Sequence, residues 1–275
     1  MCIIDNRLES YHSFFDHAWA QRLDHLAEHS KLEQVVFDLV SSWKAIGSVR
    51  EWPWLMMHSM KTVLEAEFPK RHPISVQIVQ ALEQRLASGM GLFPLSSDQR
   101  RQLYQTLVML REQMFATDKA NPRELAIKVD EHWKGFVAIP DFALRLWKSE
   151  QNAYGAIYYA YEDFLTRCTG LARGEPEYSW LRAAEFANDL STCFGNQLQG
   201  TCWDDPTVNI SRLVRNAIVH NGGRITKHLE KLNHGLHIEG EEVTIVAPDT
   251  TSLFHSLKDR ALQFTESALQ LRALC

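Results

Sequence analysis

The sequence predicts a mainly α-helical protein, all-α in class, with one small β-hairpin before its last helix. Apolar residues recur three and four positions apart along most of the 275 residues, which is the spacing of a helix face. Proline, glycine and capping residues divide this pattern into segments of ordinary helix length. Apolar residues with high strand propensity flank a short acidic turn between residues 236 and 246, which predicts the hairpin.

The N-terminal half is expected to form a helical domain of unknown function. Helices are predicted over the approximate ranges 7–28, 30–46, 50–68, from Pro73 to 88, 96–116 and 121–139. Ser96 and Gln99 have the spacing of a capping box at the start of one of them. We expect the domain boundary between residues 139 and 141, which gives domains of 1–140 and 141–275.

The C-terminal half is expected to form a second helical domain that contains the hairpin. Its predicted elements are helices near 144–168, 178–194 and 207–220, strands at 236–238 and 243–246, and a last helix that begins at 248–251. Gly170 is expected to stop the first of these helices. Asp204 and Asp205 are hypothetical metal ligands, but a cap before Pro206 is the favoured interpretation.

Composition limits the classes of function. The chain is 45% hydrophobic and 23% charged, as in ordinary globular proteins. Its net charge is −5, so a site for a polyanion would have to be a local basic patch. The five cysteines are widely spaced and form no CxxC pair, which favours reduced thiols over a disulfide framework or a zinc site. We expect a cytoplasmic protein without metal, cofactor, signal peptide or membrane span.

The predicted helix over residues 207–220 has two chemically different faces. The face expected to point to the core carries Ile210, Leu213, Val214, Ala217 and Ile218. The opposite face carries Arg212, Arg215, Asn216 and His220. Val219 lies within that polar face, which suggests that something covers it, for example a second subunit.

The polar face has residue types that suit reactions on phosphate. The planar donor fork of Arg215 matches a phosphate group. His220 ends the helix before Asn221, and histidine suits general acid–base catalysis near neutral pH. Asn216 precedes it by one turn and can orient the imidazole or the phosphate. From spacing alone, an ordinary solvated helix face is the more common explanation of such a pattern.

The surroundings of this helix are locally basic. Between Arg212 and Lys231 there are five basic residues and one acidic residue, Glu230, in a chain that is acidic as a whole. Such a local excess is what contacts with a phosphate backbone require. The residues that we expect to contact a phosphate backbone in this way are Arg212, Arg224, Lys227 and Lys231.

The string Arg215-Asn216-Ala217-Ile218-Val219-His220 matches the R-N-x-x-x-H motif of the HEPN superfamily (higher eukaryote and prokaryote nucleotide-binding domains). The longer string RNAIVHNGGRI resembles bacterial members, and the resemblance covers about 145–275. It implies a homodimeric, metal-independent endoribonuclease in which two motifs meet in one cleft. His220 would be the general acid or base, Arg215 would stabilise the transition state, and Asn216 would position the reacting groups. A 2′,3′-cyclic phosphate product is expected.

The resemblance also implies a biological setting and its alternatives. Many relatives are toxins or anti-phage effectors, so an antitoxin or regulatory protein is an expected partner. Gly222 stands where some relatives carry a tyrosine that their antitoxin adenylylates, which argues against that form of control. One alternative is a catalytically inactive HEPN-fold module that binds a nucleotide or a protein. Another is a structural helical protein whose motif match is accidental.

Three other groups of residues have more than one interpretation. His25 and His29 have a spacing that can hold a metal, although a solvated helix face is favoured. The cluster of Trp43, Trp52, Trp54, Met56, Met57 and Met60 is interpreted as core or subunit interface, with base stacking as the alternative. One hypothesis places the acidic side chains of Glu162 and Asp163 near the motif, but the sequence does not favour it.

Overall fold

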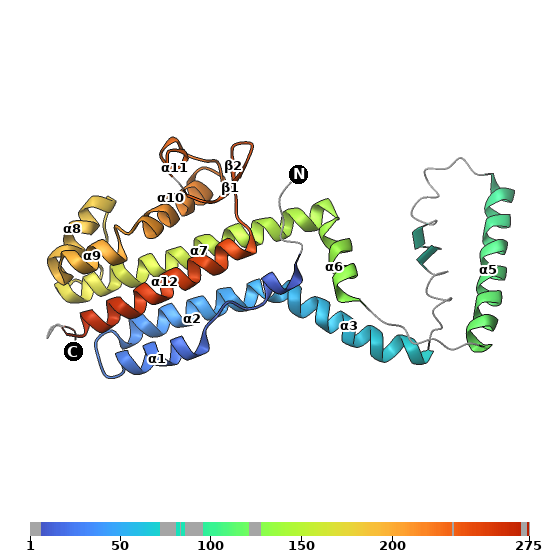
Figure 1. Ribbon diagram of the computed structural model, residues 1–275, viewed down its shortest axis with the longest axis horizontal. Helices are drawn as coiled ribbons and strands as arrows, with labels where there is room; N and C mark the ends of the chain where they lie inside the picture. Colours follow the sequence, from blue (N-terminus) through green and yellow to red (C-terminus); the bar gives the residue numbers. More distant parts are fainter. Residues whose placement is uncertain are drawn as a thin grey trace. The chain divides into compact units, whose positions relative to one another are not determined.

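The fold is mainly helical, with one antiparallel pair of strands before the last long helix, as the sequence predicts (Figure 1). This computed structural model describes residues 7–71, 81–82, 84–85, 96–120, 128–232, 234–270 and 274. Its elements are η1 (Leu8–Tyr11), α1 (His17–Ala27), α2 (Glu33–Arg50), α3 (Trp52–Arg71), α5 (Ser97–Ala120), α6 (Val129–Val137), α7 (Pro140–Arg173), α8 (Ala183–Phe194), α9 (Asn196–Cys202), α10 (Pro206–His220), α11 (Lys227–Glu230), β1 (His237–Glu239), β2 (Glu242–Thr244) and α12 (Ala247–Ala268).

The chain forms two compact units whose limits differ from the expected boundary near residue 140. Unit 1 consists of Met1–Trp54 and Trp133–Cys275, and unit 2 of Leu55–His132. The first helices belong with the C-terminal half because α1 and α2 pack against α12 and α7. The indole N–H of Trp43 on α2 donates to the carbonyl of Ile157 on α7 at 3.0 Å. A division into 1–140 and 141–275 would expose this shared core.

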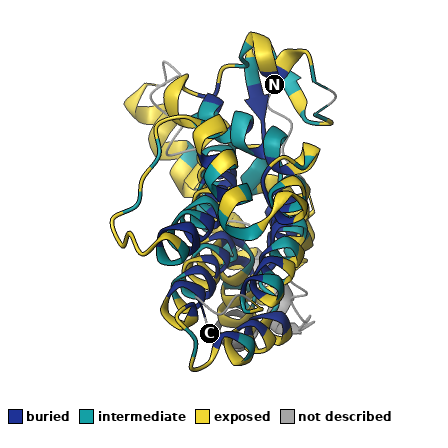
Figure 2. Cartoon of the chain, turned by 90° about the vertical axis from the view of Figure 1, so that its left-hand side faces the viewer, coloured by how far each residue is buried: buried dark blue, intermediate teal, exposed yellow. Residues whose placement is uncertain are grey.

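The centre of unit 1 is the long helix α7, which packs against α2, α10 and α12. The helices turn their buried faces toward one another, and exposed residues lie on the outside (Figure 2). The largest fully buried side chains of unit 1 include Trp43, Tyr158, Tyr161, Phe164, Phe254 and Phe264. Burial of this much aromatic surface is the main stabilising term for such a bundle.

A buried ion pair connects α2 to α7 inside unit 1. The Arg50 Nε donates to both carboxylate oxygens of Glu150, at 3.0 and 3.1 Å. Its terminal nitrogens donate to the carbonyls of Ser10, His12 and Ala247. Thr250 on α12 donates to the same carboxylate at 2.7 Å. The pair therefore joins four parts of the sequence at one point in the core.

Local capping explains several helix starts. Ser96 and Gln99 form the predicted capping box of α5, with backbone N–H to side-chain contacts of 2.9 and 3.3 Å. The carboxylate of Asp205 accepts from the N–H groups of Thr207 and Val208, so it caps α10 as favoured from the sequence.

Some helix limits differ from the prediction. Helix α7 continues past Gly170 to Arg173, and Gly174 ends it with φ of 71°. Gly170 has another role: a Cβ there would lie 2.7 Å from the Glu175 carbonyl oxygen, so the chain passes close to it. Helix α8 begins at Ala183 rather than near 178, and the short helix α9 was not predicted. The predicted helix before residue 88 and the start of the one after 121 lie largely outside the described residues.

The hairpin has the expected position and is short. Ile238 of β1 pairs with Val243 of β2, and Glu239 pairs with Glu242 across the turn. Gly240 takes φ of 65°, which a two-residue hairpin turn requires. Val243 is fully buried and anchors the hairpin to the core of unit 1.

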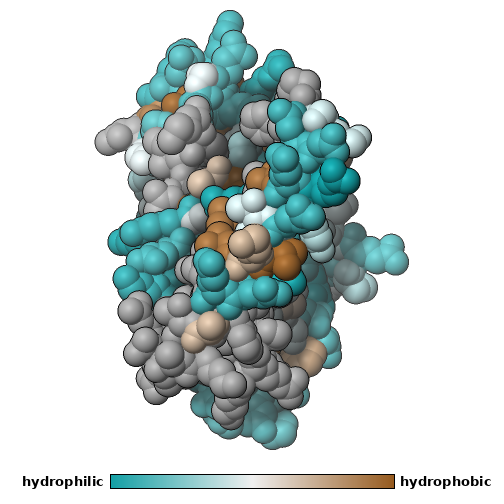
Figure 3. Space-filling view, turned by 90° about the vertical axis from the view of Figure 1, so that its right-hand side faces the viewer, coloured by the Kyte–Doolittle hydropathy of each residue, from teal (hydrophilic) through white to brown (hydrophobic). Residues whose placement is uncertain are grey.

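Unit 2 contains α5 and most of α3. Large apolar side chains that it exposes include Val63, Tyr104 and Met109. Figure 3 shows one face of the molecule on which hydrophobic side chains gather among hydrophilic ones. In the described ranges, no helix combines the length and apolar character needed to cross a bilayer.

Candidate functional site

Helix α10 carries the motif and is fixed at its start and along one face. Asp205 caps it, and Pro206 occupies the first turn, where an N–H has no helical partner. Val208, Val214 and Ala217 are fully buried, while Arg215 and Asn216 on the other face are half-buried. The amphipathic interpretation of this helix is therefore confirmed for its core side.

Two motif residues are in direct contact. The Arg215 Nη1 donates to the Asn216 Oδ1 at 3.0 Å. The Arg215 guanidinium also lies over the ring of Tyr159 on α7, with its Cζ 5.8 Å from the ring centroid. These contacts hold the guanidinium on the outer side of α10 and leave further N–H donors for a ligand.

His220 is the last residue of α10 and its side chain is exposed. The helix ends because Asn221 and Gly223 both donate their N–H to the carbonyl of Ala217, at 3.1 and 2.9 Å. Gly222 and Gly223 have φ of 62° and 88°, which side chains other than glycine rarely adopt. The predicted glycine stop after the motif is confirmed.

The segment after His220 is tied to the rest of unit 1. Val243 on β2 donates to the carbonyl of Gly223 at 2.9 Å. The Gln151 amide of α7 donates to the carbonyl of Val243 at 2.9 Å, and a Cβ on Gly223 would lie 3.3 Å from that amide nitrogen. The hairpin, the helix α7 and the glycine turn therefore hold the end of α10, where His220 lies.

Arg212 lies one turn before Arg215 and is only partly satisfied. Its Nη2 donates to the Asn209 Oδ1 at 2.6 Å, and its guanidinium lies over the Trp203 ring with the Cζ 4.7 Å from the centroid. Its Nη1 is buried and has no hydrogen-bond partner in the described part of the chain.

Helix α7 brings Glu162 and Tyr158 to the same cluster. Burial raises the pKa of the Glu162 carboxyl, while the positive charges of Arg215 and Arg212 lower it. Burial also raises the pKa of the Tyr158 hydroxyl, which has no hydrogen-bond partner among the described residues. The sequence did not favour a position of Glu162 close to the motif. The packing of α7 on α10 brings its carboxyl near the motif arginines, and this packing cannot be read from the sequence.

The other predicted RNA contacts lie beyond the end of α10. Arg224 is exposed and forms an isolated β-bridge with Glu242. Lys227 starts α11, Lys231 follows its end, and both are exposed. Arg212 therefore belongs to the motif cluster, whereas the other three form the exposed basic surface after it.

The candidate metal ligands do not assemble into a site. No group of three or more His, Cys, Asp or Glu side chains in the described part of the chain could hold a metal ion. His25 and His29 are exposed, each beside Glu28, at 3.6 and 3.8 Å.

In the tryptophan and methionine cluster, Trp43 and Met57 are buried, whereas Trp52 is 58% exposed.

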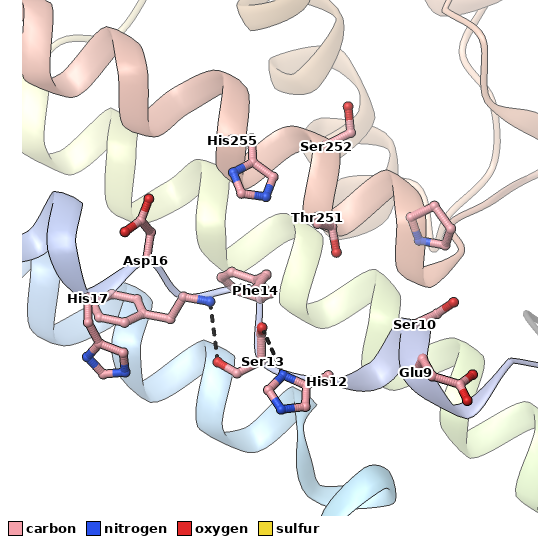
Figure 4. Close-up of a pocket in the computed structure, with 12 residues that line it drawn as sticks. Glu9, Ser10, His12, Ser13, Phe14, Asp16, His17, Thr251, Ser252 and His255 are labelled. Atoms are coloured by element: carbon pink, nitrogen blue, oxygen red, sulfur yellow. Dashed lines mark hydrogen bonds between the residues drawn. The ribbon is translucent and has the colours of Figure 1, made fainter.

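A cavity of about 770 Å³ lies between residues 9–17 and the start of α12. Figure 4 shows that His255 and Thr251 of α12 face the extended segment that carries Ser13 and His12. His12 is held beside Glu51 at 3.5 Å, and Asp16 is paired with Lys258. None of the motif residues lines this cavity.

Comparison of the chain with protein-family models, curated proteins and solved structures gives no match. Its function must therefore be inferred from its own residues.

Proposed function

We propose that the protein is a metal-independent endoribonuclease of the HEPN type that acts as a homodimer. The observation that carries the proposal is the arrangement on α10. Arg215 and Asn216 are hydrogen-bonded to each other one turn before the exposed imidazole of His220. The remaining donors of Arg215 and an exposed histidine on one helix suit a phosphodiester substrate.

The reaction would be a transfer of the phosphodiester to the neighbouring ribose hydroxyl. A His220 imidazole removes the proton of the 2′-hydroxyl, whose oxygen attacks the phosphorus. An imidazole also protonates the 5′-oxygen that leaves. Arg215 stabilises the negative charge on the phosphorane oxygens, and Asn216 holds the guanidinium in place. The products are a 2′,3′-cyclic phosphate and a 5′-hydroxyl end, and no water is consumed.

The exposed positions on the motif face support the proposed homodimer. Base and acid act on opposite sides of the phosphorus, and one chain presents one motif histidine. Val219 lies between the polar residues of α10 and is 55% exposed. A second copy placed there would bury Val219 and bring two His220 side chains to one cleft.

RNA is the favoured substrate because the polar face joins a basic surface. Arg224, Lys227 and Lys231 follow His220 directly in the chain and are exposed. They supply the backbone contacts of a longer RNA, which would make binding weaken as salt is raised. The proposed setting is the cytoplasm, as a toxin or anti-phage effector under the control of a regulatory protein.

The test is RNA cleavage by the purified wild-type protein in EDTA, beside Arg215→Ala and His220→Ala. We expect both variants to lose at least about 100-fold in rate, since each removes a group that acts in the transition state. His25→Ala is the matched control, because His25 is an exposed histidine on α1 and should leave the rate unchanged. Product ends are identified by mass spectrometry.

Retained cleavage by His220→Ala would contradict the mechanism. RNA binding by the wild-type protein without cleavage would favour the alternative, a HEPN-fold module that binds nucleotides without catalysis.

A further inference from the structure

A groove between α2 and α7 adjoins the motif cluster. It has a volume of about 340 Å³ and an apolar floor that includes Leu39 and Ala160. Asp38 and Ser42 of α2 and Asp163 of α7 supply its polar groups. Tyr159 lines the groove and also carries the Arg215 guanidinium over its ring. This one side chain therefore joins the groove to the motif.

The charges of the groove and of the motif helix are opposite. Arg215 stands on the α10 side of Tyr159. On the groove side, Arg167 contacts both carboxylates, at 2.7 Å from Asp38 and 3.7 Å from Asp163. One guanidinium and two carboxylates leave a net negative charge, so a phosphate is repelled from the groove. An uncharged planar group meets no such penalty there.

We propose that this groove binds one unstacked nucleobase of a single-stranded RNA, stacked on Tyr159, while the adjoining phosphate lies at Arg215. This inference rests on the proposed ribonuclease function and names the form of its substrate. The Tyr159 side chain is 56% exposed, so its ring is available to a ligand. Proteins commonly hold unpaired bases by stacking them on aromatic rings beside a basic track for the backbone.

The polar groups of the groove favour particular bases. The Asp163 carboxylate offers acceptors, and the Ser42 hydroxyl can donate or accept. A carboxylate pairs with base edges that present an exocyclic amino group, as in adenine, cytosine and guanine. Uracil presents no amino group. The groove therefore selects an amino-bearing base over uracil next to the bond that is cleaved.

The experiment uses the full chain and a short 2′-O-methyl oligouridine that carries one 2-aminopurine. This RNA lacks the attacking hydroxyl, so it binds without being cleaved. Stacking quenches the fluorescence of 2-aminopurine. We expect quenching with the wild type and Tyr159→Phe, and its loss with Tyr159→Ala, whose affinity falls about tenfold. Phe37→Ala is the matched control, because Phe37 is 57% exposed on α2 and lies outside the groove.

Base selection is tested with the same protein and unlabelled competitors. An oligouridine with one adenine should compete several-fold better than oligouridine alone, and Asp163→Asn should reduce this difference. Equal competition by the two RNAs would overturn the selection of an amino-bearing base. Quenching that persists in Tyr159→Ala, or absence of quenching with the wild type, would overturn the stacking site.

Failure of the groove and failure of the ribonuclease give different results. Cleavage of unmodified RNA without quenching would retain the ribonuclease and reject the groove. Quenching without cleavage would retain the groove and reject the catalytic role. A change of oligomeric state in Tyr159→Ala, seen by size-exclusion chromatography, would assign Tyr159 to a protein contact and overturn the inference.

Discussion

Unit 1 contains arginines in two very different environments. Arg50 lies in the core, where its guanidinium donates to a carboxylate and to three backbone carbonyls. Arg212 and Arg215 lie on the outer side of α10, where each has one side-chain acceptor in the described part of the chain. Arg50 is thus satisfied by the protein itself, while the half-buried Arg215 keeps donors that a ligand can use.

This difference separates a structural charge from the charge to which we assign a function. A buried charge is tolerated when its partners compensate for the loss of water. A half-exposed guanidinium keeps donors in contact with water, and an anion can take the place of that water. Arg215 is therefore the guanidinium to which the proposed function assigns the phosphate.

The largest expected effect is on the core pair. Arg50→Met leaves the Glu150 carboxylate buried without its cation, and we expect the free energy of unfolding to fall by about 3–5 kcal/mol. Arg215→Met removes a charge with fewer partners and should lower it by less than about 1 kcal/mol. Urea denaturation followed by circular dichroism measures both variants.

A double variant sharpens this prediction. Arg50→Met combined with Glu150→Leu removes both charges, so it should be more stable than Arg50→Met alone. Equal destabilisation by Arg50→Met and Arg215→Met would contradict the distinction between the two environments.

Two buried tyrosines of α7 also differ in whether the protein supplies a hydrogen-bond partner, and the expected effects on stability are smaller. The Tyr161 hydroxyl donates to the Cys202 carbonyl at 2.8 Å, whereas the Tyr158 hydroxyl has no partner in the described part of the chain. Tyr161→Phe should therefore lower the free energy of unfolding by about 1 kcal/mol. Tyr158→Phe should leave it unchanged or raise it, because it removes an unmet buried hydroxyl. A loss of stability in Tyr158→Phe equal to that in Tyr161→Phe would show that this hydroxyl has a partner in solution.

Local sequence patterns predicted local structure well. The Asp205 cap, the Ser96 capping box and the glycine stop after His220 follow from neighbouring residues, and all three are present. The expected end of α7 was wrong because Gly170 is required for a close approach by residues 175–178, which helix periodicity does not reveal.

Contacts between distant segments could not be predicted in the same way. Arg50 and Glu150 are 100 residues apart, and no spacing rule connects them. The expected boundary near residue 140 failed for this reason, because the first two helices complete the core around α7. At the candidate site, the residues on α10 follow from the sequence. Glu162, Tyr158 and Tyr159 require knowledge of how α7 packs on that helix.

The smallest expected effect belongs to a partnered charge near the surface. A hydrogen bond from Lys258 lowers the pKa of Asp16 below its usual 3.8, and one from the Trp19 N–H adds to this. The unfolded chain therefore takes up this proton first as pH falls. The resulting stability is present above about pH 4 and is lost as pH falls through the folded-state pKa. The Asp16 carboxylate is the N-cap of α1, because it accepts from the Trp19 N–H. Lys258→Met keeps this cap and removes only the ion pair. We expect it to lower the free energy of unfolding by less than about 1 kcal/mol at neutral pH, since the pair is partly exposed.

Urea denaturation at a series of pH values measures the difference in the free energy of unfolding between the wild type and Lys258→Met. This difference should shrink as the medium becomes acidic. A difference that instead grew would contradict the direction of the pKa shift.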